Sequence, residues 1–289
     1  MLRLSIPVVF VLIWSTGFIV AKAVVPHADL QVFLLARFSL TALLMGCVAL
    51  FAGVQWPGAG RAVPHLIAGA LMQGIYLCAS FWAITHGMAA GVMALLGALQ
   101  PLFTALIAVS IMGSTLRPRT WVGLIVGFAG VGLVLAPKLA RTDVGSLALT
   151  ATGAALLSVL AVTGGTIVQK RLAATDLRAA ACIQTCGAAM VAALSTILIG
   201  SGRWDGTPIL WGALAWSVLV PSMVATTLFV WMMRNGEATK VTALLLLVPP
   251  LAAVQAYVFF GERLAPVQFI GFAFALAGVL MTRSSRVPN

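Results

Sequence analysis

Long apolar stretches separated by short polar links run along the whole chain. Each stretch is about as long as the 18 or more residues that an α-helix needs to cross the hydrocarbon core of a bilayer. The pattern therefore predicts ten membrane-spanning helices, at residues 4–25, 30–53, 63–86, 89–112, 119–137, 145–169, 177–200, 208–233, 239–260 and 265–282. The stretches lack the short polar and apolar alternation of transmembrane β-strands, which excludes a β-barrel.

The second half of the chain repeats the pattern of the first. Shifts of 147 to 149 residues align the two halves, and they take Gly17 to Gly165, Ser15 to Thr163, Asp29 to Asp176, Gln73 to Ser222, Pro101 to Pro250, Gly123 to Gly271 and Gly130 to Gly278. Five helices in each half are an odd number, so the second unit enters the membrane from the opposite side. We therefore predict an all-α membrane protein of ten transmembrane helices, built as two inverted-topology repeats over residues 1–140 and 141–289. Such repeats are typical of secondary transporters, which bind substrate near the midplane between the halves.

Composition supports a membrane protein and argues against a nucleic-acid partner. The 289 residues are 62% hydrophobic and only 8% charged, and a soluble domain with this composition would expose much of its apolar surface. The net charge of +11 is scattered over the links and does not gather in one basic patch, so we expect no nucleic-acid binding.

The positions of the basic residues predict the orientation in the membrane. If the N-terminus is cytoplasmic, the basic residues of the inner segments are Arg3, Arg61, Arg117, Arg119, Lys170, Arg171, Arg178, Arg234, Lys240, Arg283 and Arg286. Those of the outer segments are Lys138, Arg141, Arg203 and Arg263, while Lys22 and Arg37 lie within spans. Because cytoplasmic links carry the excess of Lys and Arg, both termini are predicted to be cytoplasmic.

Several segments resemble a known family of transporters. They are Trp14 to Phe18, the Ala36-Arg37 step, and Pro250 followed by Gly261-Glu262-Arg263-Leu264, Gln268, Gly271 and Gly278. The pattern is similar to the EamA family of the drug/metabolite transporter superfamily over nearly the whole chain, in two copies, and is most like the YddG-type amino acid exporters. The resemblance implies ten helices and the export of small metabolites, including aromatic and other neutral amino acids.

What the resemblance implies extends to location and partners. It implies a multi-pass protein of the bacterial cytoplasmic membrane with a small-molecule substrate; we expect a monomer without a cofactor or metal. The chain departs from the family pattern at two places. Gly113-Ser114-Thr115 stands where Gly-Glu-Arg is expected, and Trp14 to Phe18 read Trp-Ser-Thr-Gly-Phe rather than Trp-Gly-Ser-Asn-Phe.

Polar side chains inside the predicted spans are the candidates for a substrate cavity. Polar groups are costly in lipid, so they should face the protein interior or a water-filled cavity. Gln73, Tyr76 and Ser80 share one helix face because they are three and four residues apart. The residues expected to line the cavity are Trp14, Ser15, Gln73, Tyr76, Ser80, Gln100, Ser158, Thr163, Ser222 and Thr226. The alternative is that the hydroxyl groups hold helices together or bond their own backbone.

Prolines and one arginine also lie within the spans. Pro101, Pro249 and Pro250 are expected to kink their helices, either as hinges that face the substrate or only to shape packing. Arg37 could pair with Asp29, extend to the interface, or contact a substrate carboxylate, and we favour these alternatives in that order.

The acidic residues restrict the mechanism. Asp29, Asp143, Asp176, Asp205, Glu237 and Glu262 all fall in predicted links or at helix ends. A proton-coupled exporter of cationic drugs usually needs a carboxylate within the membrane, so a neutral or zwitterionic substrate is favoured. Export of other metabolites or drugs is the alternative. An intramembrane enzyme is disfavoured because the chain lacks a predicted cluster of acids, histidines or nucleophile and base.

Overall fold

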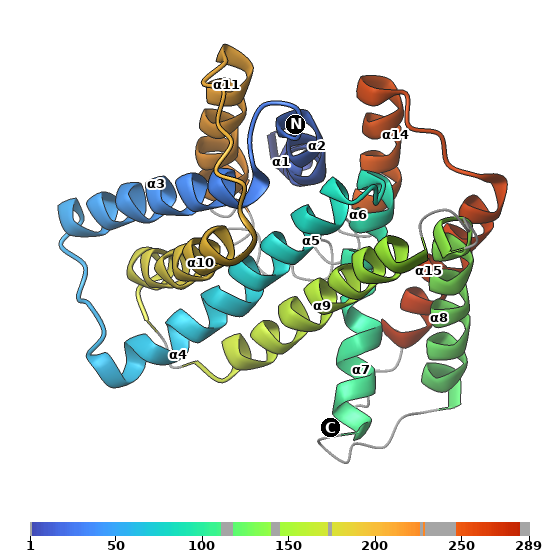
Figure 1. Cartoon of the computed structure of the whole chain (residues 1–289). Coiled ribbons are helices and arrows are strands. Elements are labelled where there is room, and N and C mark those ends of the chain that lie inside the picture. Colours follow the sequence, from blue (N-terminus) through green and yellow to red (C-terminus); the bar gives the residue numbers. More distant parts are fainter. Residues whose placement is uncertain are drawn as a thin grey trace.

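The computed structural model describes residues 2–110, 118–139, 145–172, 175–225, 228 and 247–283. In these ranges the chain is helical, and its extended pairing is limited to a bridge between Ala28 and Trp204. Figure 1 shows the helices as packed rods joined by short links. The predicted all-α class is therefore confirmed in the part of the chain that the structure describes.

The observed helices follow the predicted spans closely. The α-helices are α1 Leu2–Ser15, α2 Gly17–Val24, α3 Leu30–Phe51, α4 Ala59–Gly69, α5 Tyr76–Thr85, α6 Ala90–Ala98, α7 Gln100–Ser110, α8 Pro118–Leu139, α9 Gly145–Lys170, α10 Leu177–Ile199, α11 Pro208–Ser217, α14 Val248–Phe260 and α15 Pro266–Arg283. The π-helical segments within the described ranges are η1 Ala70–Ile75 and η3 Val218–Ala225.

Ten apolar segments are found among the described residues. Those long enough to cross a membrane are Leu30–Phe51, Ala59–Thr85, Pro118–Pro137, Leu149–Lys170, Leu177–Ile199 and Pro208–Ala225. The shorter ones are Val9–Val24, Ala90–Thr104, Val248–Phe260 and Pro266–Met281. Each of them falls on one of the ten predicted spans, as expected for a ten-helix membrane protein.

Several spans are interrupted near their middle, among them the fourth, where Pro101 was expected to kink the helix. The first is divided between α1 and α2 at Thr16, whose hydroxyl donates to the backbone oxygen of Ile13 at 2.7 Å. The fourth is divided between α6 and α7 at Leu99, directly before Gln100 and Pro101. The third and eighth contain η1 and η3. Local side-chain bonds and proline disturb helical hydrogen bonding, which accounts for the first two interruptions.

Spans that occupy equivalent positions in the two halves pack against each other. The pairs α3 with α10, α6 with α14, and α8 with α15 are in contact, and α3 and α10 lie side by side in Figure 1. The contact of α9 with α4 and that of α2 with α11 are likewise equivalent in the two halves. The contacts have the internal symmetry that the predicted repeat requires, while the division near residue 140 stays a prediction.

Glycines allow α8 and α15 to approach very closely. A Cβ atom on Gly130 would lie 2.6 Å from the backbone oxygen of Gly271, and one on Gly278 would lie 2.5 Å from that of Gly123. Small residues let backbones meet in this way, and they replace the hydrophobic driving force that is absent in lipid. The two contacts are equivalent in the repeat, because Gly123 aligns with Gly271 and Gly130 with Gly278.

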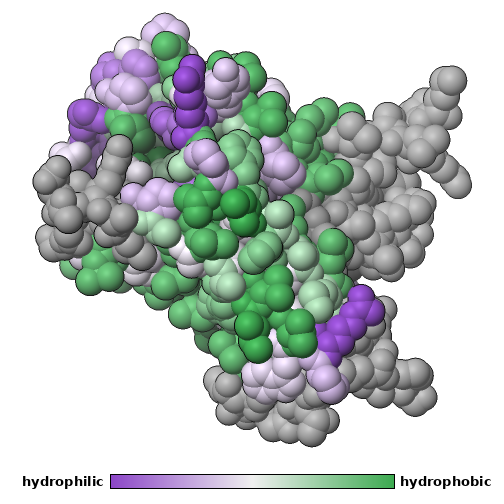
Figure 2. Space-filling view, turned by 90° about the vertical axis from the view of Figure 1, so that its right-hand side faces the viewer, coloured by the Kyte–Doolittle hydropathy of each residue, from purple (hydrophilic) through white to green (hydrophobic). Residues whose placement is uncertain are grey.

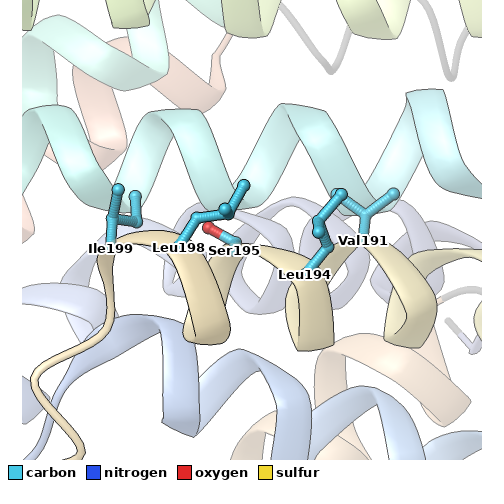
Figure 3. A pocket seen from close by; sticks show the side chains of 5 residues that line it. All are labelled: Val191, Leu194, Ser195, Leu198 and Ile199. Carbon is cyan, nitrogen blue, oxygen red and sulfur yellow. The ribbon is translucent and has the colours of Figure 1, made fainter.

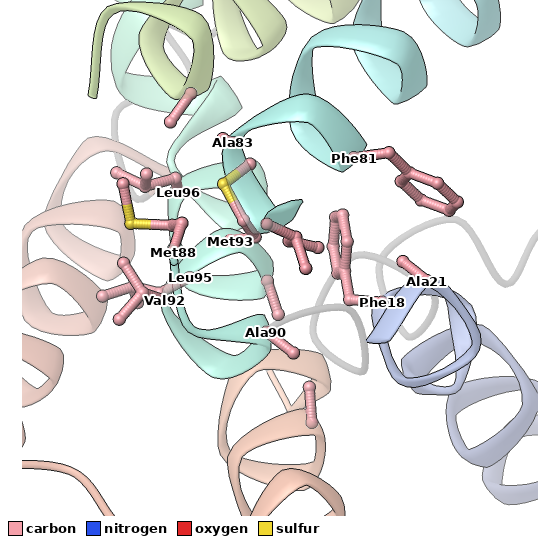
Figure 4. Packing of buried hydrophobic residues seen from close by; sticks show 14 of the residues in the cluster. Phe18, Ala21, Phe81, Ala83, Met88, Ala90, Val92, Met93, Leu95 and Leu96 are labelled. Carbon is pink, nitrogen blue, oxygen red and sulfur yellow. The ribbon is translucent and has the colours of Figure 1, made fainter. Parts of the chain in front are cut away.

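A buried apolar core joins the elements around the middle of the molecule. Phe18 of α2, Phe81 of α5, and Met93 and Leu96 of α6 belong to it, and Figure 4 shows their side chains meeting between these helices. On the outside, Phe51 is 94% and Ile197 is 80% exposed. Figure 2 shows hydrophobic side chains across the middle of one face, with hydrophilic ones gathered above. This distribution suits a helical bundle surrounded by lipid.

Candidate functional site

Polar side chains lie at the interruption between α1 and α2. The buried Ser15 hydroxyl donates to Leu12 O at 2.9 Å and accepts from Gln255 Nε2 of α14 at 2.9 Å. The Oε1 atom of Gln255 is buried and lacks a hydrogen-bond partner among the described residues. Thr16 accepts from Trp216 Nε1 at 3.2 Å. The first span is therefore hydrogen-bonded to the eighth and ninth spans at the point where its helix is divided.

The side chain of Arg37, a residue of α3, extends toward η3. Its Nε and Nη2 atoms each lie 3.3 Å from Ser222 Oγ, which itself donates to Ser217 O at 2.9 Å. The arginine side chain is buried, at 7% exposure, so it does not extend to the interface. Asp29 does not pair with it, because that carboxylate accepts from Gln31 N and Ser201 Oγ. The two alternatives that we favoured for Arg37 are thus wrong.

A second set of polar side chains lies among the third, fourth and sixth spans. Gln100 Nε2 donates to Thr166 Oγ1 of α9 at 2.6 Å, beside the interruption at Leu99. Tyr76 is partly buried and packs edge-on against Phe18, with ring centroids 6.3 Å apart. Gln73 is partly exposed in η1. Sequence reasoning missed Thr166, although it lies one helical turn from Thr163.

Other candidates use their hydroxyl groups within their own helices. Ser80, Ser158 and Thr163 are fully buried and donate to Tyr76 O at 2.6 Å, Ala155 O at 2.7 Å and Val159 O at 2.7 Å, respectively. These are the backbone bonds that the alternative interpretation expected.

The remaining candidates differ in their surroundings. Trp14 is 42% exposed and its ring lies 5.3 Å from that of Phe10. Thr226 lies outside the described residues. Pro101 is the second residue of α7, and Pro249 and Pro250 lie in the first turn of α14. Proline is tolerated in a first turn because the missing N–H has no helical partner there. The role of these prolines as hinges stays a prediction.

One end of the molecule is closed by bonds between links far apart in sequence. Lys22 pairs with Glu262, and its ammonium lies 5.3 Å from the centre of the Phe260 ring. His27 Nδ1 lies 2.7 Å from Asp205 Oδ2. Hydrogen bonds from Thr207 N and other groups lower the pKa of Asp205. The links at residues 25–29, 200–207 and 261–265 thus belong to the same end.

Asp29 is central to this end. It caps α3 by accepting from Gln31 N at 2.7 Å, accepts from Ser201 Oγ at 2.8 Å, and its own N–H donates to Arg203 O at 2.8 Å. Partial burial would raise the pKa of Asp29, but the hydrogen bonds from Ser201 and Gln31 outweigh it and lower the pKa below its ordinary value. The carboxylate is therefore held in its charged form.

The opposite end is joined by a polar chain. His65 Nε2 of α4 lies 3.1 Å from Thr175 Oγ1, and its Nδ1 lies 3.3 Å from Gln184 Nε2 of α10. Gln184 also donates to Gln169 Oε1 at 2.8 Å. No group of three metal-ligating side chains occurs among the described residues, so the polar chain is interpreted as packing between the third, sixth and seventh spans.

A shallow hollow lies on the outer surface of α10. Val191, Leu194, Ser195, Leu198 and Ile199 line about 190 Å³ (Figure 3). A neighbouring hollow of about 270 Å³ adds residues of α5 and α9, among them Trp82 and Leu157. Leu198 is 70% exposed, and neither hollow contains a residue expected to bind substrate. We interpret both as grooves facing lipid.

Known proteins match between about two thirds and nearly all of this chain. The sequence pattern of the EamA-like transporter family matches residues 4–136 and 149–284. A probable terminal-alkyne amino-acid exporter of Streptantibioticus cattleyicolor is 25% identical over 95% of this chain and 91% of its own length. A probable amino-acid metabolite efflux pump of Escherichia coli is 26% identical over 69% of each chain. A solved crystal structure, 20% identical, shares the fold with a TM-score of 0.64 over 96% of this chain and 94% of its own.

Proposed function

The chain belongs to the EamA-like transporter family, and from this premise we propose that it exports amino acids, aromatic or other neutral ones, by alternating access. The transported molecule binds between the five-helix units of residues 1–140 and 141–289. The protein works in the bacterial cytoplasmic membrane with both termini in the cytoplasm. The end that holds Lys22 and Glu262 then faces outward.

One observation supports this proposal above the others. The first, third, fourth and eighth spans are interrupted near their middle, and Ser15, Gln73, Gln100 and Ser222 lie at or beside the interruptions. Irregular helices in lipid must be buried in protein or line a cavity. In transporters built from inverted repeats, such interruptions at the repeat interface form the substrate site.

The substrate class follows from charge and from the relatives. The acidic residues that the structure describes lie in links or at helix ends, as Asp29 and Glu262 illustrate. A permanently cationic substrate would therefore meet no carboxylate within the described spans. A zwitterion with an apolar side chain fits better, and both named relatives are described as exporters or efflux pumps of amino acids or their metabolites. The family and these names indicate a transporter rather than an enzyme.

Transport by the purified full chain in liposomes tests the proposal. We expect flux of L-phenylalanine or L-leucine in a panel that also contains cationic drugs, sugars and nucleosides, measured with and without a pH gradient. Flux of only the non-amino-acid compounds would favour the second candidate, export of other metabolites or drugs, and would overturn the amino-acid assignment.

Two variants test the position of the site. Trp14→Ala and Tyr76→Ala should each lower amino-acid flux by up to about tenfold, because each removes an aromatic contact worth about 0.5–1.5 kcal/mol from an interrupted span. Trp121→Ala is the control, since Trp121 is 44% exposed, close to the 42% of Trp14, but belongs to α8, whose helix is continuous over its described residues. All proteins must elute as a single species in detergent. Unchanged flux in both site variants would place substrate binding elsewhere.

A further inference from the structure

Arg37 is a buried cation within a span. It lies seven residues into α3, about 10 Å along the helix axis from Leu30, and only 7% of its surface is exposed. The ion pairs among the described residues join Lys22 with Glu262 and His27 with Asp205, and so do not include it. The partners found for the guanidinium are the Ser222 hydroxyl and the ring of neighbouring Phe38, 5.9 Å away.

These partners do not compensate the charge. Removing a guanidinium from water costs several kcal/mol, and an uncharged hydroxyl at 3.3 Å returns only a small part of that. Charged groups within membranes are accordingly rare, and they usually face a partner of opposite charge or a path for ions or substrate. In the described part of the chain, the anion that would balance Arg37 is missing.

The surroundings of Arg37 are suited to an anion with two oxygen atoms. Ser217, one turn before Ser222, has a buried hydroxyl without a hydrogen-bond partner among the described residues. Ser222 lies in η3, and π-helical turns are frequent at functional sites. A guanidinium has parallel N–H groups that match a carboxylate. The Ser222 hydroxyl lies beside the Arg37 guanidinium, and the unpartnered Ser217 hydroxyl belongs to the residue whose backbone oxygen accepts from Ser222.

The other half of the chain lacks this arrangement. The shift that aligns Asp29 with Asp176 takes Arg37 to Gln184, which is uncharged and bonds Gln169 and His65. The same alignment takes Ser222 to Gln73. A pair of neutral amides thus replaces the cation and its hydroxyl, so the site carries a charge in only one half. A substrate between the halves would be oriented with its negative group toward α3.

We propose that Arg37, together with the hydroxyls of Ser217 and Ser222, binds the carboxylate of the transported molecule in the outer half of the membrane. The proposal rests on the proposed function, and it deepens it by naming the substrate group that is recognised. In the described conformation the Ser222 hydroxyl donates to Ser217 O, so it must turn from that oxygen toward the carboxylate when the substrate binds beside Arg37. Compounds without a free carboxylate are then poor substrates.

Binding to the purified full chain tests the subsite without relying on transport. The probes are L-phenylalanine with L-phenylalaninamide, and N-acetyl-L-phenylalanine with its amide, so that each pair differs only at the carboxylate. We expect the acids to raise the melting temperature of the natural protein and the amides to leave it unchanged. Arg37→Gln should weaken binding of the acids at least about tenfold, the usual loss for a hydrogen bond to a charged group.

Control variants separate binding from a structural role. Arg178→Gln removes an exposed arginine of α10 and should bind the acids as the natural protein does. Arg37→Lys keeps the charge without the paired N–H groups and should recover part of the affinity. Without ligand, Arg37→Gln should melt no lower than the natural protein, because it removes an uncompensated buried charge.

The possible outcomes distinguish failure of the carboxylate subsite from failure of the proposed function. Equal binding of acids and amides, or unchanged binding in Arg37→Gln, overturns the subsite even if liposomes show amino-acid flux. Binding of N-acetyl-L-phenylalanine through Arg37 without any amino-acid flux keeps the subsite and overturns the proposed function.

Discussion

Gly130 of α8 lies against Gly271 of α15 so closely that a methyl group on Gly130 would come within 2.6 Å of the Gly271 backbone oxygen. It would also come within 2.4 Å of the backbone nitrogen of Ala275. Backbone atoms cannot turn aside as a side chain can, so the two helices would have to separate. The fifth and tenth spans are therefore held together by the absence of side chains at this crossing.

The first prediction follows from this crossing. Gly130→Ala should destabilise the protein by about 1–3 kcal/mol, the usual cost of overpacking. Gly132→Ala, two residues away on an open side of the same helix, should be neutral or stabilising by about 0.5–1 kcal/mol, since alanine favours helices. Thermal unfolding in detergent measures both. Equal melting temperatures for the two variants would contradict the close approach of α8 and α15.

The positions of the helices could be predicted from the sequence because lipid demands long apolar segments with satisfied backbones. The pairing of Gly123 with Gly271 in the repeat was also visible. That Gly123 meets Gly278 and that Gly271 meets Gly130 across the two halves was not, since an internal alignment gives equivalence and not contact. The interruption at Thr16 was missed because a hydroxyl that bonds its own backbone looks the same as one that faces a cavity.

Arg37 shows why part of the site could not be predicted. Asp29 is the nearest acid in sequence, and pairing between the two was the simplest expectation. In the structure, the Asp29 carboxylate accepts hydrogen bonds from Ser201, which lies 172 residues away, and from Gln31 N as the cap of α3. The partner of Arg37, Ser222, is 185 residues away. Contacts over such separations depend on how the two halves pack, and a single sequence does not encode them in any local pattern.

A second prediction concerns the ion pair between Lys22 and Glu262. It joins the first span to the link before α15, with side-chain exposures of 32% and 15%. Lys22→Glu and Glu262→Lys should each lower the melting temperature, and the double exchange should recover most of the loss. The coupling should be about 1 kcal/mol or less, as for other partly exposed pairs.

Arg263 provides the control for this pair. It is the neighbour of Glu262 and takes part in neither of the ion pairs found among the described residues. Arg263→Glu should therefore show no coupling with Lys22→Glu in the same melting experiments. If the double exchange is no better than the worse single variant, the ion pair does not hold this end of the molecule together.

A third prediction compares two helix caps that are equivalent in the repeat. Asp29 caps α3 and also bonds Ser201, whereas Asp176 caps α10 by accepting from Arg178 N. Asp176→Ala should cost about 1 kcal/mol, as for other lost caps. Asp29→Ala should cost more, because it also leaves Ser201 and the 200–207 link without their partner. Equal costs would show that the bond to Ser201 adds nothing.

The same residue gives a pH dependence. The pKa of Asp29 lies below its ordinary value of 3.8 in the folded protein, so its charged form stabilises the fold above that value. This stability is lost as pH falls through the lowered folded pKa. The difference in melting temperature between the natural protein and Asp29→Ala should be constant above about pH 5 and shrink below about pH 4. A difference that grows on acidification would contradict the assignment.

The last prediction concerns the bond between Gln100 and Thr166, which joins the fourth span to the sixth beside the interruption at Leu99. Gln100 Nε2 donates to the Thr166 hydroxyl, which in turn donates to Val162 O at 2.7 Å. A double-mutant cycle with Gln100→Leu and Thr166→Val should give a coupling of about 0.5–1 kcal/mol, as for other bonds between helices in membranes. Thr163→Val is the matched control, because that hydroxyl bonds only Val159 O within its own helix, and its coupling with Gln100→Leu should be near zero. Equal couplings for Thr166 and Thr163 would mean that Gln100 contributes through packing alone.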